Sequence, residues 1–168
     1  MENGELNAVL KIRDKIQSSE TCSFTATVTA DYGDEIYVFT TDCQFDNIGN
    51  MTFTVVQPES IAGITGAVTD SGGKLTFDDK TLAFETLADG LVVPVSAPWL
   101  MMKTLRGGYI TGAGKDEDNI HAVIHDTYDE QALTLDFWFY ETGSPDYCQI
   151  FWQGRRILSM EVENFVVM

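Results

Sequence analysis

The sequence has little positive charge. Its 168 residues include 10 Lys and Arg against 26 Asp and Glu, which gives a formal net charge of -16 at pH 7. A molecule of this charge repels phosphate backbones and anionic lipid headgroups. We therefore predict no nucleic-acid partner and no electrostatic docking to a membrane surface.

Long apolar segments and linkers are also missing. No segment approaches the roughly 20 consecutive apolar residues of a membrane span, and the polar start Met1-Glu2-Asn3-Gly4 lacks a hydrophobic signal core. We expect a start codon fused to a mature sequence, whose signal peptide and lipid-anchoring cysteine were removed upstream. No Pro/Ser-rich or charged linker divides the chain, so we predict a single domain over residues 1–168.

Cysteine is scarce, and its spacing excludes some chemistry. The three cysteines include no CxxC pair, which excludes zinc-ribbon and thioredoxin-like sites. A two-residue turn at Tyr32-Gly33 would place Cys22 directly across from Cys43 in a hairpin. These two residues then either form a cross-strand disulfide or pack as buried thiols, and Cys148 is left over.

The two histidines are weak candidates for a metal site. His121 and His125 lie four residues apart on one face of a predicted strand, next to Asp126 and after the acidic residues 116–118. No third ligand follows at a spacing that a strand would fix, so solvent-facing histidines beside a charged turn are favoured over a divalent-metal site. We therefore predict no metal.

Motifs for catalysis are absent. The sequence has no Gly-rich phosphate loop, nucleophile elbow or zinc-protease helix. Most Asp and Glu residues fall at predicted turns or on polar strand faces, where they stay solvated. We predict a protein without enzymatic activity and without a cofactor.

The dominant pattern that is present is a two-residue alternation of apolar and polar residues. It runs from Thr21 to Val56 and returns from Leu133 to Val162, which is typical of antiparallel strands with one apolar face. Turn residues separate the runs. In the first half we predict strands at 21–31, 35–45, 50–57, 61–69, 74–77 and 81–85. In the second half, strands around 135–140 and 148–152 lead into a last strand at 162–167.

Two helices are predicted. Apolar residues and one arginine recur at helical spacing over residues 5–17, in a stripe of Leu6, Val9, Leu10, Arg13 and Ile16. A second helix begins after Ser96 as its cap, carries Pro98 in its first turn and ends at Gly107-Gly108. Because this helix is apolar nearly all round, we expect it to cover the concave apolar face of the sheet, as a core helix rather than a movable lid. The fold class is mainly β (α+β), with a strongly curved antiparallel sheet.

Several short motifs accompany this order of elements. They are FTVVQPESIAGI at 53–64, the Pro-bounded helix in mid-chain, YETGSP at 140–145 and ENF at 163–165. Together they resemble the LolA-like lipoprotein family over essentially the whole chain. More narrowly, the sequence is similar to small lipoproteins of Gram-positive bacteria such as the germination lipoprotein GerS.

This resemblance implies an incomplete β-barrel wrapped around helices, in a lipoprotein anchored to the outer face of the cytoplasmic membrane. The best-known members of the family bind acyl chains in the concave cavity, whereas GerS-like members hold a cell-wall amidase. The arginine that controls the closed state of the carriers has no match in this sequence.

Two non-enzymatic functions are therefore predicted. In the first, the concave face binds an apolar ligand such as a lipid acyl chain, unless its side chains simply fill each other's space. In the second, a sheet edge or the acidic surface docks a protein of the cell envelope, or a second copy to form a dimer. The predicted lining of the apolar cavity is Phe24, Val28, Phe39, Phe53, Val55, Phe77, Trp99, Leu100, Met102, Phe137, Phe139 and Trp152.

Overall fold

The protein is built on one antiparallel sheet that curves around two helices. The computed structural model describes residues 3–69, 74–77, 87–88, 92–127 and 132–168. The helices are α1 (Gly4–Ser18) and α2 (Ala97–Gly107), with a short 3-10 helix η1 (Pro94–Ser96) directly before α2. The strands are β1 (Thr21–Asp31), β2 (Ile36–Asp46), β3 (Met51–Gln57), β4 (Thr65–Thr69), β5 (Lys74–Phe77), β6 (Tyr109–Asp116), β7 (Asn119–His125), β8 (Thr134–Phe139), β9 (Pro145–Trp152) and β10 (Arg155–Val167).

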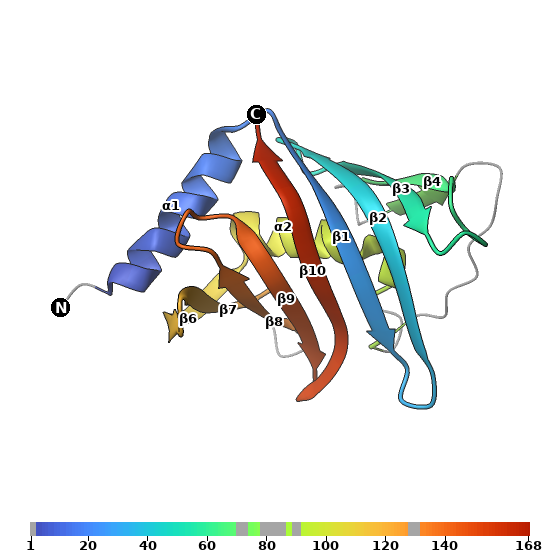
Figure 1. Ribbon diagram of the computed structural model, residues 1–168. Helices are drawn as coiled ribbons and strands as arrows, with labels where there is room; N and C mark the ends of the chain where they lie inside the picture. Colours follow the sequence, from blue (N-terminus) through green and yellow to red (C-terminus); the bar gives the residue numbers. More distant parts are fainter. Residues whose placement is uncertain (1–2, 70–73, 78–86, 89–91, 128–131) are drawn as a thin grey trace.

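The sheet is open. Its ten strands are ordered β5-β4-β3-β2-β1-β10-β9-β8-β7-β6, so β5 and β6 are its edges and the first and last strands pair at its centre. Figure 1 shows α2 crossing behind β10 and β1, with α1 beside the β6–β9 half of the sheet. α2 contacts both β2 and β7, and α1 contacts β6, β7 and α2. The predicted mainly β fold with a curved, incomplete barrel is confirmed.

The alternation in β1 positions its side chains as predicted. Cys22, Phe24, Ala26, Val28 and Ala30 are buried, while the residues between them are only partly buried. Threonines on the other face bond across the strands, as in the hydrogen bond between the hydroxyls of Thr27 and Thr40. The sheet therefore has one apolar face and one polar face, as period-two patterning requires.

The predicted register of the first hairpin is wrong. Asp31 pairs with Ile36, so the loop has four residues, 32–35, instead of two. The longer loop shifts the pairing by two residues and puts Cys22 opposite Phe45 and Phe24 opposite Cys43. A shift by two leaves every side chain on its predicted face but separates the two cysteines. All three cysteines are free and buried, so of the two predicted alternatives the buried thiols are found and the Cys22–Cys43 disulfide is not.

The boundaries of other predicted strands differ in part. β3 ends at Gln57 before Pro58 as predicted, but β4 begins only at Thr65 because residues 58–63 form turns. The predicted strand 81–85 lies outside the described residues. Where β4 does form, it pairs with both β3 and β5 and extends the sheet by short hairpins.

α1 is amphipathic, but its stripe is rotated from the predicted one. Val9, Ile12 and Ile16 are buried, whereas Leu10 is 45% exposed. The predicted stripe included Leu10 and omitted Ile12. The side of α1 that faces the sheet therefore contains Val9, Ile12 and Ile16, which are spaced three and four residues apart.

α2 is a core helix. Eight of its residues, from Ala97 to Leu105, are buried, and the indole Nε1 of Trp99 donates to the carbonyl of Gly49 at 2.8 Å. Its first turn contains Pro98 and its C-cap is Gly108, as predicted. Ser96 is the N-cap residue as predicted, but its side chain makes no capping hydrogen bond, because its hydroxyl donates back to the Val93 carbonyl at 2.7 Å. Among the described residues, neither helix has the length and apolar character needed to cross a membrane.

Candidate functional site

The residues predicted to line an apolar cavity lie in the packed core. Phe137 and Phe139 stack with ring centroids 5.7 Å apart, and the other members pack around them and α2. Trp152 is only partly buried, and the side chain of Phe77 lies outside the described residues. The buried members are Phe24, Val28, Phe39, Phe53, Val55, Trp99, Leu100, Met102, Phe137 and Phe139. Side chains from both halves of the sheet thus fill this part of the interior.

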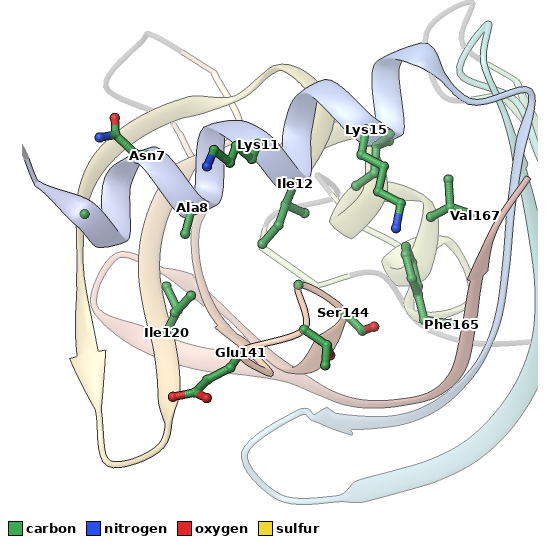
Figure 2. Close-up of a pocket in the computed structure, with 14 residues that line it drawn as sticks. Asn7, Ala8, Lys11, Ile12, Lys15, Ile120, Glu141, Ser144, Phe165 and Val167 are labelled. Carbon is green, nitrogen blue, oxygen red and sulfur yellow. The ribbon is translucent and has the colours of Figure 1, made fainter.

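A hollow with an apolar floor lies beside this core, between α1 and the sheet. It has a volume of about 410 Å³. Figure 2 shows α1 along one side, with the β8–β9 turn and the end of β10 facing it. We call this hollow the α1 groove. Its lining residues are Gly4, Asn7, Ala8, Lys11, Ile12, Lys15, Ile16, Ile120, Glu141, Thr142, Gly143, Ser144, Phe165 and Val167.

Arg13 fixes the helix that forms the upper wall of the α1 groove. Its Nε donates to the Leu105 carbonyl at 2.8 Å, and its Nη2 donates to the carbonyls of Gly108 at 2.8 Å and Thr104 at 3.3 Å. These acceptors belong to the C-terminal end of α2, where a cation also interacts favourably with the helix dipole. Arg13 therefore anchors α1 to α2 from the side of the helix that does not line the groove.

The end of β10 forms the floor. The ladder between β10 and β9 ends at Glu161 and Tyr147, yet β10 continues to Val167 along β1. Phe165 and Val167 line the groove, and the ring of Phe165 stacks on Phe24 with centroids 5.8 Å apart. Thus one predicted cavity residue, Phe24, supports the floor from below.

The alternation rule missed this floor. Counting by two from the buried Val162 would turn Asn164 and Val166 inward. Instead Asn164 has φ 56°, the register with β1 shifts near Ser23, and Val166 is 48% exposed. A bulge of this kind reverses which side chains face the core. The one sequence signal was Asn164 itself, since asparagine tolerates the left-handed region.

The opposite rim of the groove is the β8–β9 turn. Gly143 adopts φ +99°, and a Cβ added there would lie 3.5 Å from Ile12 Cγ1. The turn thus approaches α1 closely at a position that favours glycine. Beside it, Glu141 and Ser144 supply polar groups to the rim, across from Lys11 and Lys15 of α1 (Figure 2).

The two histidines do not form a metal site. At about 3.3 Å per strand residue, His121 and His125 are separated by roughly 13 Å along β7, too far to share an ion. The ring of His121 packs at a tilt against Trp138 with centroids 4.8 Å apart, and His125 lies edge-on to Tyr109. Within the described ranges, no three His, Cys, Asp or Glu side chains are grouped to hold a metal ion.

The cysteines are poorly suited to nucleophilic chemistry. Burial raises the pKa of the Cys43 thiol to about 12. Burial also raises the pKa of Cys148 well above its ordinary value. The pKa of Cys22 is raised by burial as well, although the hydrogen bond with Ser19 and the charge of Lys15 act to lower it. Thiolate is the reactive form, so these side chains behave as small core residues.

The fold is an open half-barrel with helices on the concave side of one sheet, which is the architecture that the sequence resemblance implied. No family model matches the chain, and no curated protein matches it. Among solved structures it is similar to a LolA superfamily protein from Nitrosomonas europaea, at 8% identity over 95% of this chain and 93% of that chain, with a TM-score of 0.44.

Two further solved structures have comparable similarity. A putative outer membrane lipoprotein-sorting protein domain from Vibrio parahaemolyticus has 7% identity over 97% of this chain and 92% of that chain, with a TM-score of 0.43. MucB, in the complex structure of Pseudomonas aeruginosa MucA and MucB, has 12% identity over 98% of this chain and 57% of that chain, with a TM-score of 0.40. At such identities, ligand and partner have to be argued from this chain's own residues.

Proposed function

We propose that this half-barrel is a non-enzymatic binding protein of the cell envelope that holds a lipid acyl chain, or a similarly apolar ligand, in the α1 groove. The observation that carries the proposal is the groove itself. Its floor and inner wall are apolar, formed by Ala8, Ile12, Ile16, Phe165 and Val167, and they continue directly into the core. Its volume of about 410 Å³ lies within the range of roughly 300–1,000 Å³ for ligand sites.

The energetic basis of such binding is removal of apolar surface from water. Each Å² buried on both partners contributes about 25 cal/mol. An acyl chain seated between α1 and β10 would cover the exposed parts of Phe165 and Val167 together with its own methylenes. The residues predicted to line the concave face lie beneath the groove, where Phe24 stacks on the ring of Phe165 and positions it.

The side chains favour binding over catalysis. The thiols are buried with raised pKa values. The groove itself contains one carboxylate, Glu141, and no histidine or cysteine. An acid–base or nucleophilic mechanism needs a second group within hydrogen-bond reach. We therefore infer a carrier or holder, displayed outside the cytoplasmic membrane through a lipid anchor.

One observation favours a second candidate function, an interaction module at the cell envelope that holds a partner such as a cell-wall enzyme. Beyond Glu161 the ladder between β9 and β10 stops while β10 continues to Val167. Strand segments that extend past their neighbour can accept an added strand from another protein. In this alternative, a peptide rather than an acyl chain occupies the α1 groove.

A matched pair of variants on α1 tests the groove. Ala8 lines it, whereas Leu10 lies on the same helix and is 45% exposed. Ala8→Trp fills the groove, so we expect affinity for a fluorescent fatty acid to fall at least tenfold, while Leu10→Trp leaves it unchanged. Circular dichroism and urea unfolding verify that both variants fold. Equal affinity in the two variants would overturn the assignment of the groove.

A further inference from the structure

The helical wall of the α1 groove has two rows of side chains. Ala8, Ile12 and Ile16 form an inner apolar row, and Asn7, Lys11 and Lys15 form a polar row one residue away. Residues four apart on a helix lie on the same face, so each row runs along the length of the groove. Figure 2 shows Lys15 extending from α1 toward Phe165 and Val167, with Lys11 one turn earlier on the helix.

Lys11 and Lys15 bring two positive charges to one side of the groove in a molecule that is acidic overall. The chain has only 10 Lys and Arg and a net charge of -16. Neither Lys11 nor Lys15 takes part in the ion pairs His121–Asp136 and Arg155–Asp31. One carboxylate, that of Glu141, lines the groove, and it projects from the β8–β9 turn on the side across from the helix (Figure 2).

We propose that Lys11 and Lys15 select the ligand: the groove takes an anionic amphiphile with a single acyl chain, whose carboxylate or phosphate head lies at the lysine row and whose chain lies along the inner row. This inference rests on the proposed function. The lysine row supplies the polar groups that fix a ligand's orientation in a mostly apolar site. It also gives charge complementarity with an anionic head.

A structural role for the same lysines makes a different prediction. Lysine stems often cover apolar surface while the ammonium stays in water. If that were their whole role, methionine would replace them without loss, because it offers a similar unbranched apolar stem. The double variant Lys11→Met/Lys15→Met therefore separates charge recognition from simple coverage.

The experiment compares four ligands of equal chain length. Hexadecanoate, hexadecyl phosphate, hexadecanol and hexadecyltrimethylammonium compete with a bound fluorescent probe on the full chain, below their aggregation concentrations. We expect the two anions to bind roughly tenfold more tightly than hexadecanol, the gain expected from two partly exposed charge contacts. The tighter of the two anions identifies the head chemistry, carboxylate or phosphate.

The variants then assign this preference to the lysine row. In Lys11→Met/Lys15→Met the anions should weaken roughly tenfold while hexadecanol is unchanged, and Lys11→Arg/Lys15→Arg should restore the preference. The control is Lys115→Met/Arg156→Met, which removes the same net charge at two exposed positions outside the groove. This control should bind like the wild type if the effect is local.

The outcomes separate the two proposals. Equal binding of anions and hexadecanol by the wild type would overturn the lysine inference and leave the acyl-chain function standing. An anion preference that survives in the methionine double variant would do the same. Failure of all four ligands to displace or replace the probe would overturn the proposed function and this inference together.

Discussion

The backbone at Gly108 has no room for a side chain. A Cβ added there would lie 2.6 Å from the His125 carbonyl oxygen and 2.7 Å from the Thr104 carbonyl oxygen. Both contacts are with backbone, so we expect Gly108→Ala to lower the free energy of unfolding by about 1–3 kcal/mol. Urea unfolding measures the change.

The neighbouring glycine supplies the control for this prediction. A Cβ at Gly107 would meet nothing within 4 Å. Because alanine favours helix over glycine, Gly107→Ala should be neutral or stabilise the protein by up to about 1 kcal/mol. Equal changes in the free energy of unfolding for the two substitutions would contradict the close packing of Gly108, at the end of α2, against β7.

The buried thiol of Cys43 makes stability depend on pH in the alkaline range. Burial raises its pKa from an ordinary 9.0 to about 12, so the folded state keeps a proton that the unfolded state loses. The stabilisation is fully present below pH 9.0 and is lost as pH rises toward 12. Over this window its contribution should fall by about 1.4 kcal/mol per pH unit.

Comparison with Cys43→Ala isolates this titration from those of lysines, tyrosines and the other two thiols. The variant is less stable at neutral pH because it leaves a small cavity, but its stability should fall less steeply above pH 9.0. Unfolding by urea at several pH values gives both slopes. Parallel slopes would contradict the burial of this thiol.

At the scale of elements, one side chain joins the two helices. Arg13 donates to three carbonyls at the C-terminal end of α2. Removing it leaves those acceptors without a charged donor, so Arg13→Met should lower the free energy of unfolding by about 1–3 kcal/mol. Arg13→Lys should recover only part of this, because one ammonium cannot match the fork of the guanidinium. A change below about 0.5 kcal/mol for Arg13→Met, the size of an ordinary surface substitution, would contradict the anchoring role.

The types of β1 and α2, and the buried face of β1, could be predicted from local patterns. The alternation in β1 and the Pro98 to Gly108 signals of α2 depend on short-range chemistry, and both elements form where expected. Register is different, since it depends on loop geometry. The four residues at 32–35 replaced the expected two-residue turn and thereby separated Cys22 from Cys43.

The groove was not predictable because it depends on two local departures and one long-range arrangement. The bulge at Asn164 turns Phe165 and Val167 inward, against the period of the strand. The apolar stripe of α1 is centred on Ile12 instead of Leu10, because Arg13 fixes α1 against α2, which is distant in the sequence. The alternation correctly identified the core but could not show which of its borders stays open.

At the scale of the whole molecule, the open sheet determines how the interior is closed. Ten strands curve around α2 without β5 meeting β6, so the interior is completed by the two helices rather than by closure of the barrel. Most of the residues that were predicted to line a cavity instead fill that interior. The apolar groove lies at the border of the core, under α1. The apolar groove with two lysines beside it is the feature on which our proposal of a small anionic amphiphile as ligand rests.

The most direct test of this account is native mass spectrometry of the protein purified from a lipid-containing lysate, followed by organic extraction. We predict a stoichiometric acyl-chain species in the wild type that is absent from Ala8→Trp and retained in Leu10→Trp. A clean apo mass, together with no uptake of hexadecanoate, would contradict the acyl-chain function and leave the protein-docking alternative.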